Sequence, residues 1–227
     1  PKMFNYTLMQ KARSDKKHIV LPEGQDHRIL KAADKLLSNE IVKLTLLGNE
    51  EEILTQIARL GIDFTGKDVS IVTPNKSANF ISYVEEFYKL RKHKGVTIEA
   101  AADAISDVSY YGTMMVYMGH ADGMVSGALH TTQHTIRPAL QFIKTRPGIG
   151  LVSSVFFMCL EDRVLVYGDC AINPNPTAEE LAEIAISSAQ TANAFGVLPK
   201  IAMLSYSSGI SGKGAEVEKV RSATELV

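Results

Sequence analysis

Hydrophobic residues follow two alternating patterns through the first half of the chain. Short continuous apolar runs predict buried strands at His18–Leu21, Val42–Leu47 and Val69–Val72. Between and after these runs, apolar residues recur at the spacing of a helix. They predict helices at Phe4–Ser14, after Asp26, at Glu50–Leu60, at Ala78–Lys92, from Thr97 to Ile105, and at Ser109–Met118. Strands that alternate with helices predict a parallel sheet with helices on both faces.

The pattern changes after Lys144–Gly148, a short polar stretch that contains a Pro-Gly pair. We therefore expect two α/β domains with mostly parallel sheets, comprising residues 1–145 and 146–227. The second part predicts two adjacent strands joined by a tight turn, a long helix, a third strand and a final helix. These elements are expected at Leu151–Leu160, Val164–Tyr167, Thr177–Phe195, Lys200–Leu204 and Ala215–Val227. The last helix has no closing glycine and no basic final turn, so we expect the chain to be a fragment of a longer protein.

Composition narrows the class of protein. The 227 residues are 45% hydrophobic and 22% charged, as in a globular domain, and the net charge of -1 gives no general attraction for nucleic acid or anionic membrane. No apolar run approaches the ~20 residues of a membrane span. The two cysteines, Cys159 and Cys170, lack the spacing of a metal or redox motif and are expected to be reduced core thiols. We expect a cytoplasmic protein without nucleic-acid or membrane partners.

The segment from Gly123 to Arg137 is the main candidate for chemistry. A short apolar strand runs into small residues and hydroxyls, among them Ser126, Thr131 and Thr132, and then into a helix expected to hold Arg137 near its first turn. Exposed backbone N–H groups, hydroxyls and a guanidinium at a helix N-terminus together favour an anion. The chain has no acidic residue between Ser126 and Lys144. The alternative is an ordinary strand–loop–helix turn with an arginine on the surface.

Other candidate groups carry weaker signals. Arg91 lies at the end of a basic helix. It is either a solvated capping charge or points into a cleft, from the side opposite Arg137, to hold a phosphate or pantetheine-nucleotide anion. His130 and His134 have the spacing of a metal pair, but no third ligand accompanies them, so no metal is expected. Asp169 follows a strand, where a turn-forming role is commoner than a catalytic one. The Gly/Ser loop between residues 205 and 214 does not have the glycine spacing of a phosphate-binding Walker loop.

Five stretches of the chain, in this order and spacing, resemble the phosphate acetyltransferases of the phosphate acetyl/butyryltransferase family. They are Leu21–Arg28, Leu90–Gly95, Ala121–Gly127, Thr135–Pro138 and Met203–Ser207. The resemblance runs from about Phe4 to Val227 and covers roughly the N-terminal two-thirds of a family member. It implies two α/β domains with the active site in the cleft between them, and usually a homodimer.

The resemblance also implies a reaction, in which an acetyl group moves between coenzyme A and inorganic phosphate. The substrates are then acetyl-CoA, CoA, phosphate and acetyl phosphate, with no metal and no bound organic cofactor. Two family arginines that bind substrate and CoA anions fall on Arg91 and Arg137. The small hydroxyl residues of the acetyl-phosphate site fall at Thr131 and Thr132, with Ser126 beside them.

One departure from the family limits this expectation. Family members continue into a Pro-x-Asn-Asp-Leu-Ser-Arg-Gly motif, with a phosphate-binding Ser and Arg and a nearby Asp proposed as the base for the CoA thiol. This chain lacks that motif. If it were the whole protein, the resemblance would imply an incomplete site with little or no activity. The alternatives are butyryl or propionyl transfer, a catalytically inactive CoA- or nucleotide-binding module, and an oxidoreductase. The last lacks its Gly-x-Gly-x-x-Gly fingerprint.

Overall fold

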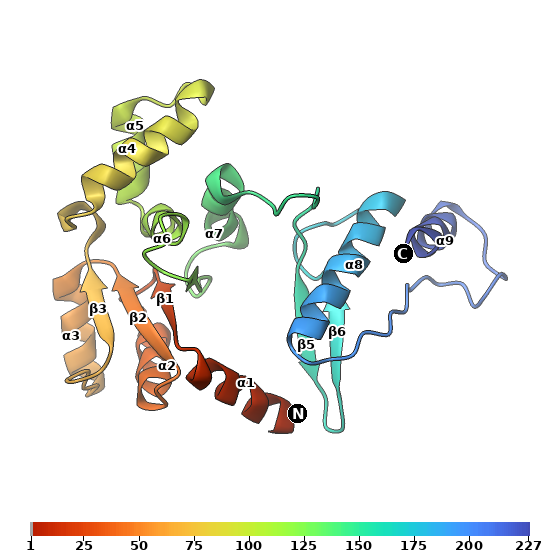
Figure 1. Cartoon of the computed structure of the whole chain (residues 1–227), viewed down its shortest axis with the longest axis horizontal. Helices are drawn as coiled ribbons and strands as arrows, with labels where there is room; N and C mark the ends of the chain where they lie inside the picture. Colours follow the sequence, from red (N-terminus) through yellow and green to blue (C-terminus); the bar gives the residue numbers. More distant parts are fainter. Residues whose placement is uncertain (1) are drawn as a thin grey trace. The chain divides into compact units, whose positions relative to one another are not determined.

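The computed structural model describes residues 2–227, which form two compact units (Figure 1). One unit comprises Met9–Lys144. The other comprises the chain up to Leu8 together with Thr145–Val227. The N-terminal helix α1 (Lys2–Ser14) begins in this second unit because the ring of Phe4 stacks on Phe157, with centroids 5.7 Å apart. The sequence assigned these first residues to the other domain.

The Met9–Lys144 unit is built on a four-stranded parallel sheet with the order β3-β2-β1-β4. The strands are β1 (Lys17–Leu21), β2 (Val42–Leu47), β3 (Val69–Val72) and β4 (Gly123–Met124). In β1, Leu21 lies opposite Leu46 of β2, and Val20 lies opposite Met124 of β4. The predicted α/β class and the parallel sheet of the first domain are confirmed.

Helices cover both faces of this sheet, as the alternation predicted. On one face, α2 (His27–Ser38) and α3 (Glu50–Leu60) pack on Leu21, Leu44 and Leu46. On the other face, Val20 and Leu47 belong to a core with α4 (Phe80–Arg91), α5 (Ile98–Ser106) and α6 (Val108–Tyr117). Neighbouring strand residues thus enter different cores, because successive side chains of a strand point to opposite faces.

Local signals set the ends of these helices. The Asp26 carboxylate accepts the backbone N–H of Arg28 and begins α2, and the Thr97 hydroxyl accepts that of Ala100 and begins α5. Gly61 ends α3 in the left-handed conformation, at a φ of 66° that glycine adopts without strain. After α4 a 3-10 turn (Lys92–Lys94) ends the basic helix.

The second unit contains an antiparallel pair of strands, β5 (Val155–Cys159) and β6 (Val164–Gly168). Helix α8 (Ala178–Ala194) packs against β6, and α9 (Ala215–Leu226) packs against α8. A capping box between Thr177 and Glu180 starts α8. The expectation of a mostly parallel sheet is wrong for this unit, whose described sheet is a hairpin.

The strand predicted at Lys200–Leu204 is also absent, since these described residues have no regular structure. The side chains of Ile201 and Leu204 are 46% and 84% exposed. A strand needs a neighbour to satisfy its N–H and C=O groups, and the two described strands of this unit pair only with each other. An apolar run alone is therefore not enough to predict a strand at Lys200–Leu204.

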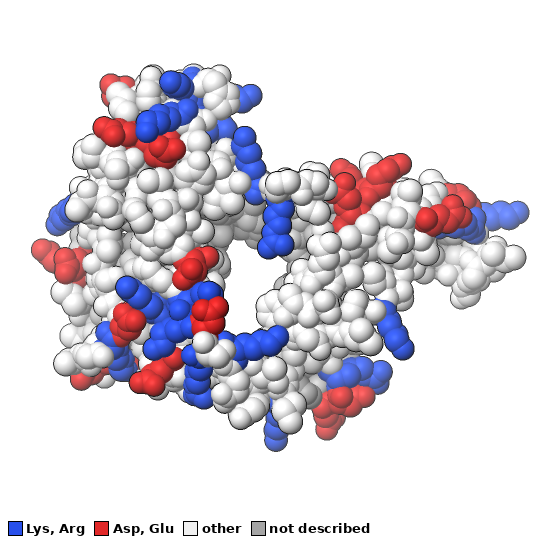
Figure 2. Space-filling model, in the orientation of Figure 1, with Lys and Arg blue, Asp and Glu red and all other residues white. Residues whose placement is uncertain are grey.

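The surface is mixed in charge. Figure 2 shows Lys and Arg side chains beside Asp and Glu over the face in view. Several exposed residues of opposite charge form close ion pairs, such as Lys17 with Asp15 at 2.7 Å. Among the helices between Lys2 and Leu226, none is long and apolar enough to cross a bilayer.

Candidate functional site

The candidate loop lies where two neighbouring strands end. β4 stops at Met124, and the N–H of Val125 still donates to the carbonyl of Val20 in β1 (3.0 Å). The chain then runs through Ser126 into helix α7 (Thr132–Pro138). Ligands of open parallel sheets commonly bind at the carboxyl ends of the strands, so this is a favourable place for a site.

A carboxylate from the end of β1 occupies the backbone of this loop. Glu23 Oε2 accepts the N–H groups of Gly127 (3.1 Å) and Ala128 (2.8 Å). Its Oε1 accepts those of Leu129 (2.7 Å) and His130 (2.8 Å). Glu23 is only 1% exposed. Burial raises the pKa of its carboxyl, but the four N–H donors outweigh burial and hold the pKa below its usual value.

The expectation that these N–H groups are exposed and free to hold an anion is therefore wrong. These N–H groups do bind an anion, but that anion is the carboxylate of Glu23. The segment after Ser126 has no acidic neighbour in sequence, and Glu23 reaches it from 104 to 107 residues earlier in the chain. The pairing of β1 with β4 helps bring the two stretches together.

A second pair of residues holds the same loop. Arg28 Nη2 donates to the carbonyl of Ala128 (2.6 Å) and to Asp26 Oδ2 (2.8 Å). Arg28 Nε also donates to Asp26 Oδ1 (3.0 Å), and this bidentate contact lowers the pKa of Asp26 to about 2. The segment after β1 therefore contacts both the N–H groups and a carbonyl of the loop. Sequence reasoning assigned no role to Glu23.

The three candidate hydroxyls are close together in sequence but have different surroundings. Ser126 Oγ accepts from the hydroxyl of Thr135 (3.4 Å). Thr131 caps α7, and its Oγ1 accepts the N–H of His134 (3.2 Å). Thr132 is the first residue of α7 and is exposed. Only the Thr132 hydroxyl is without such a contact among the described residues.

Arg137 lies in the last turn of α7, not near its first turn as predicted. The helix starts at Thr132, directly after its cap Thr131, and its α-helical stretch ends at Pro138. Arg137 is therefore its sixth residue. Arg137 is exposed, and its guanidinium forms no hydrogen bond or ion pair within residues 2–227.

Arg91 ends α4 and is half-buried. Its Nη1 donates to the carbonyl of Gln141 (3.3 Å), and its buried Nε has no partner in the described part of the chain. Gln141 belongs to a π-helical turn (Ala139–Ile143) that continues directly from α7. Arg91 therefore contacts a residue four positions beyond Arg137. Both arginines belong to one unit, and the expectation that Arg91 faces a ligand from the side opposite Arg137 stays a prediction.

His130 and His134 stack face to face, with ring centroids 4.6 Å apart. His130 Nδ1 lies 3.2 Å from Glu23 Oε1, and His134 Nε2 lies 3.1 Å from Asp107 Oδ2. Each ring thus faces its own carboxylate, and the pair does not converge on one point as metal ligands do. Within residues 2–227, no three His, Cys, Asp or Glu side chains form a possible metal site.

In the second unit, Asp169 orders a loop. Its carboxylate accepts the N–H groups of Ser154 (2.8 Å) and Ile172 (3.1 Å) and the side-chain amide of Asn173 (3.1 Å). Burial raises its pKa, but these hydrogen bonds outweigh burial and hold the pKa well below the usual range. The turn-forming role is confirmed. Cys170 is half-buried, but Cys159 is exposed, so the expectation of a core thiol is wrong there.

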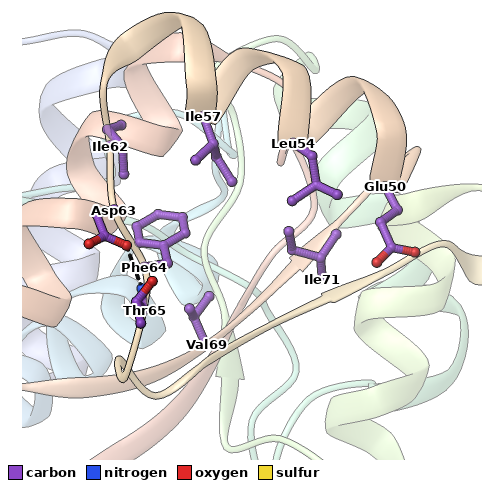
Figure 3. A pocket seen from close by; sticks show the side chains of 9 residues that line it. All are labelled: Glu50, Leu54, Ile57, Ile62, Asp63, Phe64, Thr65, Val69 and Ile71. Atoms are coloured by element: carbon purple, nitrogen blue, oxygen red, sulfur yellow. Dashed lines mark hydrogen bonds between the residues drawn. The ribbon is translucent and has the colours of Figure 1, made fainter.

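A surface hollow of about 360 Å³ lies between α3 and β3 (Figure 3). Leu54 and Ile57 of α3 line it from one side, and Ile71 of β3 lines it from the other. The carboxylates of Glu50 and Asp63 also line it, which disfavours an anionic ligand. None of the candidate residues contributes to this hollow.

The fold and the loop define an α/β protein whose candidate residues lie after the carboxyl ends of parallel strands. The sequence model described as phosphate acetyl/butaryl transferase matches residues 3–227. The chain therefore belongs to the phosphate acetyl/butaryl transferase family.

Individual relatives agree with this assignment. The chain is 60% identical to the phosphate acetyltransferase of Synechocystis sp. over 226 residues, which are 100% of the chain and 32% of that protein. It is 48% identical to the phosphate acetyltransferase of Corynebacterium glutamicum over 217 residues, covering 96% of the chain and 65% of the relative. The chain thus spans about a third of the length of the Synechocystis protein.

Solved structures show the same similarity. A phosphotransacetylase from Streptococcus pyogenes superposes with a TM-score of 0.91 at 45% identity, covering 99% of this chain and 68% of that one. The EutD phosphotransacetylase from Staphylococcus aureus gives a TM-score of 0.90 at 42% identity, covering 99% and 67%.

Proposed function

We propose that the protein to which this chain belongs transfers an acetyl group between coenzyme A and inorganic phosphate. The observation that carries the proposal is the 60% identity, across the whole chain, to a protein named phosphate acetyltransferase. The relative from Nitratidesulfovibrio vulgaris, 58% identical over 226 residues, carries the same name. The substrates are then CoA, acetyl-CoA, phosphate and acetyl phosphate.

The reaction is a direct displacement at the acetyl carbonyl. The CoA thiol resembles that of cysteine, whose nucleophilic form is the thiolate, so the thiol must lose its proton. The sulfur then attacks the carbonyl carbon of acetyl phosphate, a carbon–sulfur bond forms, and the carbonyl oxygen carries negative charge. The carbon–oxygen bond to phosphate breaks as the carbonyl reforms, and phosphate leaves with the electron pair. Both reacting groups are substrates, so positioning supplies much of the rate and no acetyl-enzyme is required.

The candidate residues fit the charges that this reaction must hold. A guanidinium can donate two parallel hydrogen bonds to a phosphate, and the exposed Arg137 is open to such a ligand. The Nε of Arg91 is a donor without a partner in residues 2–227. Hydroxyls at Ser126, Thr131 and Thr132 can donate to the acetyl phosphate oxygens. We propose these five residues as the substrate-binding and catalytic groups of this chain.

We also propose that the reaction needs no metal and no bound organic cofactor. Acetyl phosphate is already an activated acyl donor, and arginines can neutralise the leaving phosphate. The two free thiols support a reducing compartment such as the cytoplasm. A homodimer is the assembly that the family resemblance suggests, and light scattering of the purified protein tests it.

The test uses the protein expressed from its whole gene. CoA and acetyl phosphate are mixed with it in the presence of a chelator, and the new thioester is followed by its absorbance. Thioester formation at an undiminished rate is expected. Activity that a chelator abolishes and only a divalent metal restores would contradict the mechanism. Hydride transfer to NAD without acyl transfer would contradict the function. Butyryl phosphate in place of acetyl phosphate tests the acyl preference.

A further inference from the structure

Glu23 is a buried ionised group to which the proposed reaction assigns no role. Its side chain is 0% exposed, yet it is held as a carboxylate by four backbone N–H groups at 2.7–3.1 Å. A charge this deeply buried is costly unless it is fully hydrogen-bonded, and here it is. The arrangement is therefore more than local packing of the β1 turn.

The backbone beside Glu23 is itself fixed by close packing. Gly24 donates its N–H to the carbonyl of Leu47 at the end of β2 (3.0 Å). A Cβ at Gly24 would lie only 2.7 Å from that carbonyl oxygen, so the chain approaches as closely as a glycine allows. Glu23 thus extends from a rigid point of the sheet toward the loop after β4.

The chemistry of the loop calls for a carboxylate. Four N–H donors converge from Gly127 to His130, and each needs an acceptor. A carboxylate offers two oxygens and about four lone-pair sites. A glutamine would offer one oxygen, and its NH₂ group would face two of the four N–H donors. Glutamine has the same shape as glutamate, so this exchange isolates the acceptor oxygen.

The loop that Glu23 holds connects two of the candidate hydroxyls. Its first bonded N–H, on Gly127, directly follows Ser126, and its last, on His130, directly precedes Thr131. Thr131 in turn caps the helix that carries Arg137. Fixing these N–H groups therefore fixes where the Ser126 and Thr131 hydroxyls lie relative to the sheet.

We infer that Glu23 is a positioning residue that fixes the Ser126 and Thr131 hydroxyls for acetyl phosphate. This inference rests on the proposed function. Glu23 acts through the loop backbone and does not itself touch the substrate. Its removal lowers turnover, because displacing a positioned group by about 1 Å can cost ~100-fold in rate.

A purely structural role would give a different result. If Glu23 only stabilised the fold, its replacement would lower the melting temperature but leave the kinetics of the folded molecules unchanged. The matched control is Leu37→Ala, which leaves a cavity at the far end of α2. Leu37 is 6% exposed, belongs to the core of the same unit, and is not among the residues bonded to the loop.

The experiment compares Glu23→Gln, Leu37→Ala and wild type in the protein expressed from its whole gene. For Glu23→Gln we expect kcat to fall about 100-fold and the KM for acetyl phosphate to rise. The KM for CoA should stay within about twofold, because the loop is assigned to the other substrate. Leu37→Ala should lower the melting temperature and keep kcat within about twofold. Amide hydrogen exchange at Gly127–His130 should accelerate only in Glu23→Gln.

The outcomes separate the two hypotheses. Wild-type protein without acetyl transfer overturns the proposed function, and the positioning role falls with it. Active wild type with unchanged kinetics in Glu23→Gln overturns the positioning role alone. If Glu23→Gln does not fold, Glu23→Ala is purified with sodium formate, whose carboxylate can occupy the vacated N–H groups. Restoration of kcat by formate but not by formamide supports the inference, and no restoration overturns it.

Discussion

At the scale of single residues, the two candidate arginines differ in what they touch. Arg137 is exposed and forms no hydrogen bond or ion pair among residues 2–227. Arg91 is half-buried and donates to the carbonyl of Gln141. A change at Arg137 should therefore affect ligands and leave the fold intact, whereas a change at Arg91 also removes a contact within the unit. A substitution at Arg137 therefore tests ligand binding with less effect on the fold than one at Arg91.

Arg137→Ala should lower kcat/KM for acetyl phosphate by about 100-fold, which corresponds to ~3 kcal/mol for a charged donor in a substrate site. Arg137→Lys should retain more activity than Arg137→Ala, because it keeps the charge but loses the paired geometry of the guanidinium. Steady-state kinetics measure the loss, and a thermal melt should show an unchanged midpoint. Wild-type kinetics in a folded Arg137→Ala protein would mean that Arg137 is a surface charge of the helix end.

At the scale of elements, the start of α2 combines a cap with an ion pair. The Asp26 carboxylate accepts the backbone N–H of Arg28 and also binds its guanidinium. Its pKa is lowered to about 2 from an unfolded value near 3.8. A lowered pKa means that ionised Asp26 stabilises the fold above about pH 4, and that this contribution is lost as the pH falls toward 2.

Asp26→Asn should therefore destabilise the protein at neutral pH by up to about 2 kcal/mol. Asparagine still caps helices well, so the change removes mainly the charge. Urea denaturation at several pH values measures the difference from wild type, which should shrink steadily below pH 4. Asp15→Asn is the control, because the Asp15 pair with Lys17 is exposed and should contribute little at any pH. A difference that stays constant with pH would refute the ion-pair account.

The same elements show what the sequence can predict. Strands Val42–Leu47 and Val69–Val72 and helix Glu50–Leu60 occur with the predicted bounds. The apolar periodicity, the capping residues and the closing glycine lie within or next to these elements, so they can be read from the local sequence. The apolar run at Lys200–Leu204 carries an equally good local signal and forms no strand, since strand formation depends on a neighbour that local sequence does not reveal.

The candidate site was predictable to the same extent. The residues of the loop and its hydroxyls follow from local composition, because small residues and hydroxyls cluster between a strand and a helix. The acceptor of the loop N–H groups does not, because Glu23 lies 104 residues before Gly127. The position of Arg137 in the last turn also escaped prediction, since α7 begins five residues before Arg137 and its α-helical stretch ends one residue after it.

At the scale of the whole molecule, the chain forms two units with separate cores, and it passes from one to the other after Leu8 and again after Lys144. Lys144 is exposed and has a left-handed φ of 65°, and the five residues after it include Pro147 and Gly148. Such an exposed, irregular junction is where a protease finds the backbone accessible.

Limited digestion with trypsin should cut first after Lys144. The nearby bond after Arg146 is resistant, because trypsin does not readily cleave before a proline and Pro147 follows it. Mass spectrometry under denaturing conditions should find early products that end at Lys144 and early products that begin at Thr145. Denaturing conditions are needed because Phe4 of the first fragment stacks on Phe157 of the second. Lys144→Gln should remove this cut while leaving the others. Early cuts within α4 or α9, which contain Lys and Arg, would instead show that the junction is better protected than either unit.

The four backbone hydrogen bonds to Glu23 limit which amino acids the loop from Gly127 to His130 can contain. The bonds come from the main chain, so the side chains of Ala128 and Leu129 can be exchanged without disturbing them. Proline alone among the amino acids has no backbone N–H to donate. Any of the four positions from Gly127 to His130 that became proline would leave a buried lone pair of the carboxylate unmatched. The backbone N–H groups, and not the side chains, therefore restrict which residues these positions accept. A substitution scan of the loop should find proline excluded from all four positions.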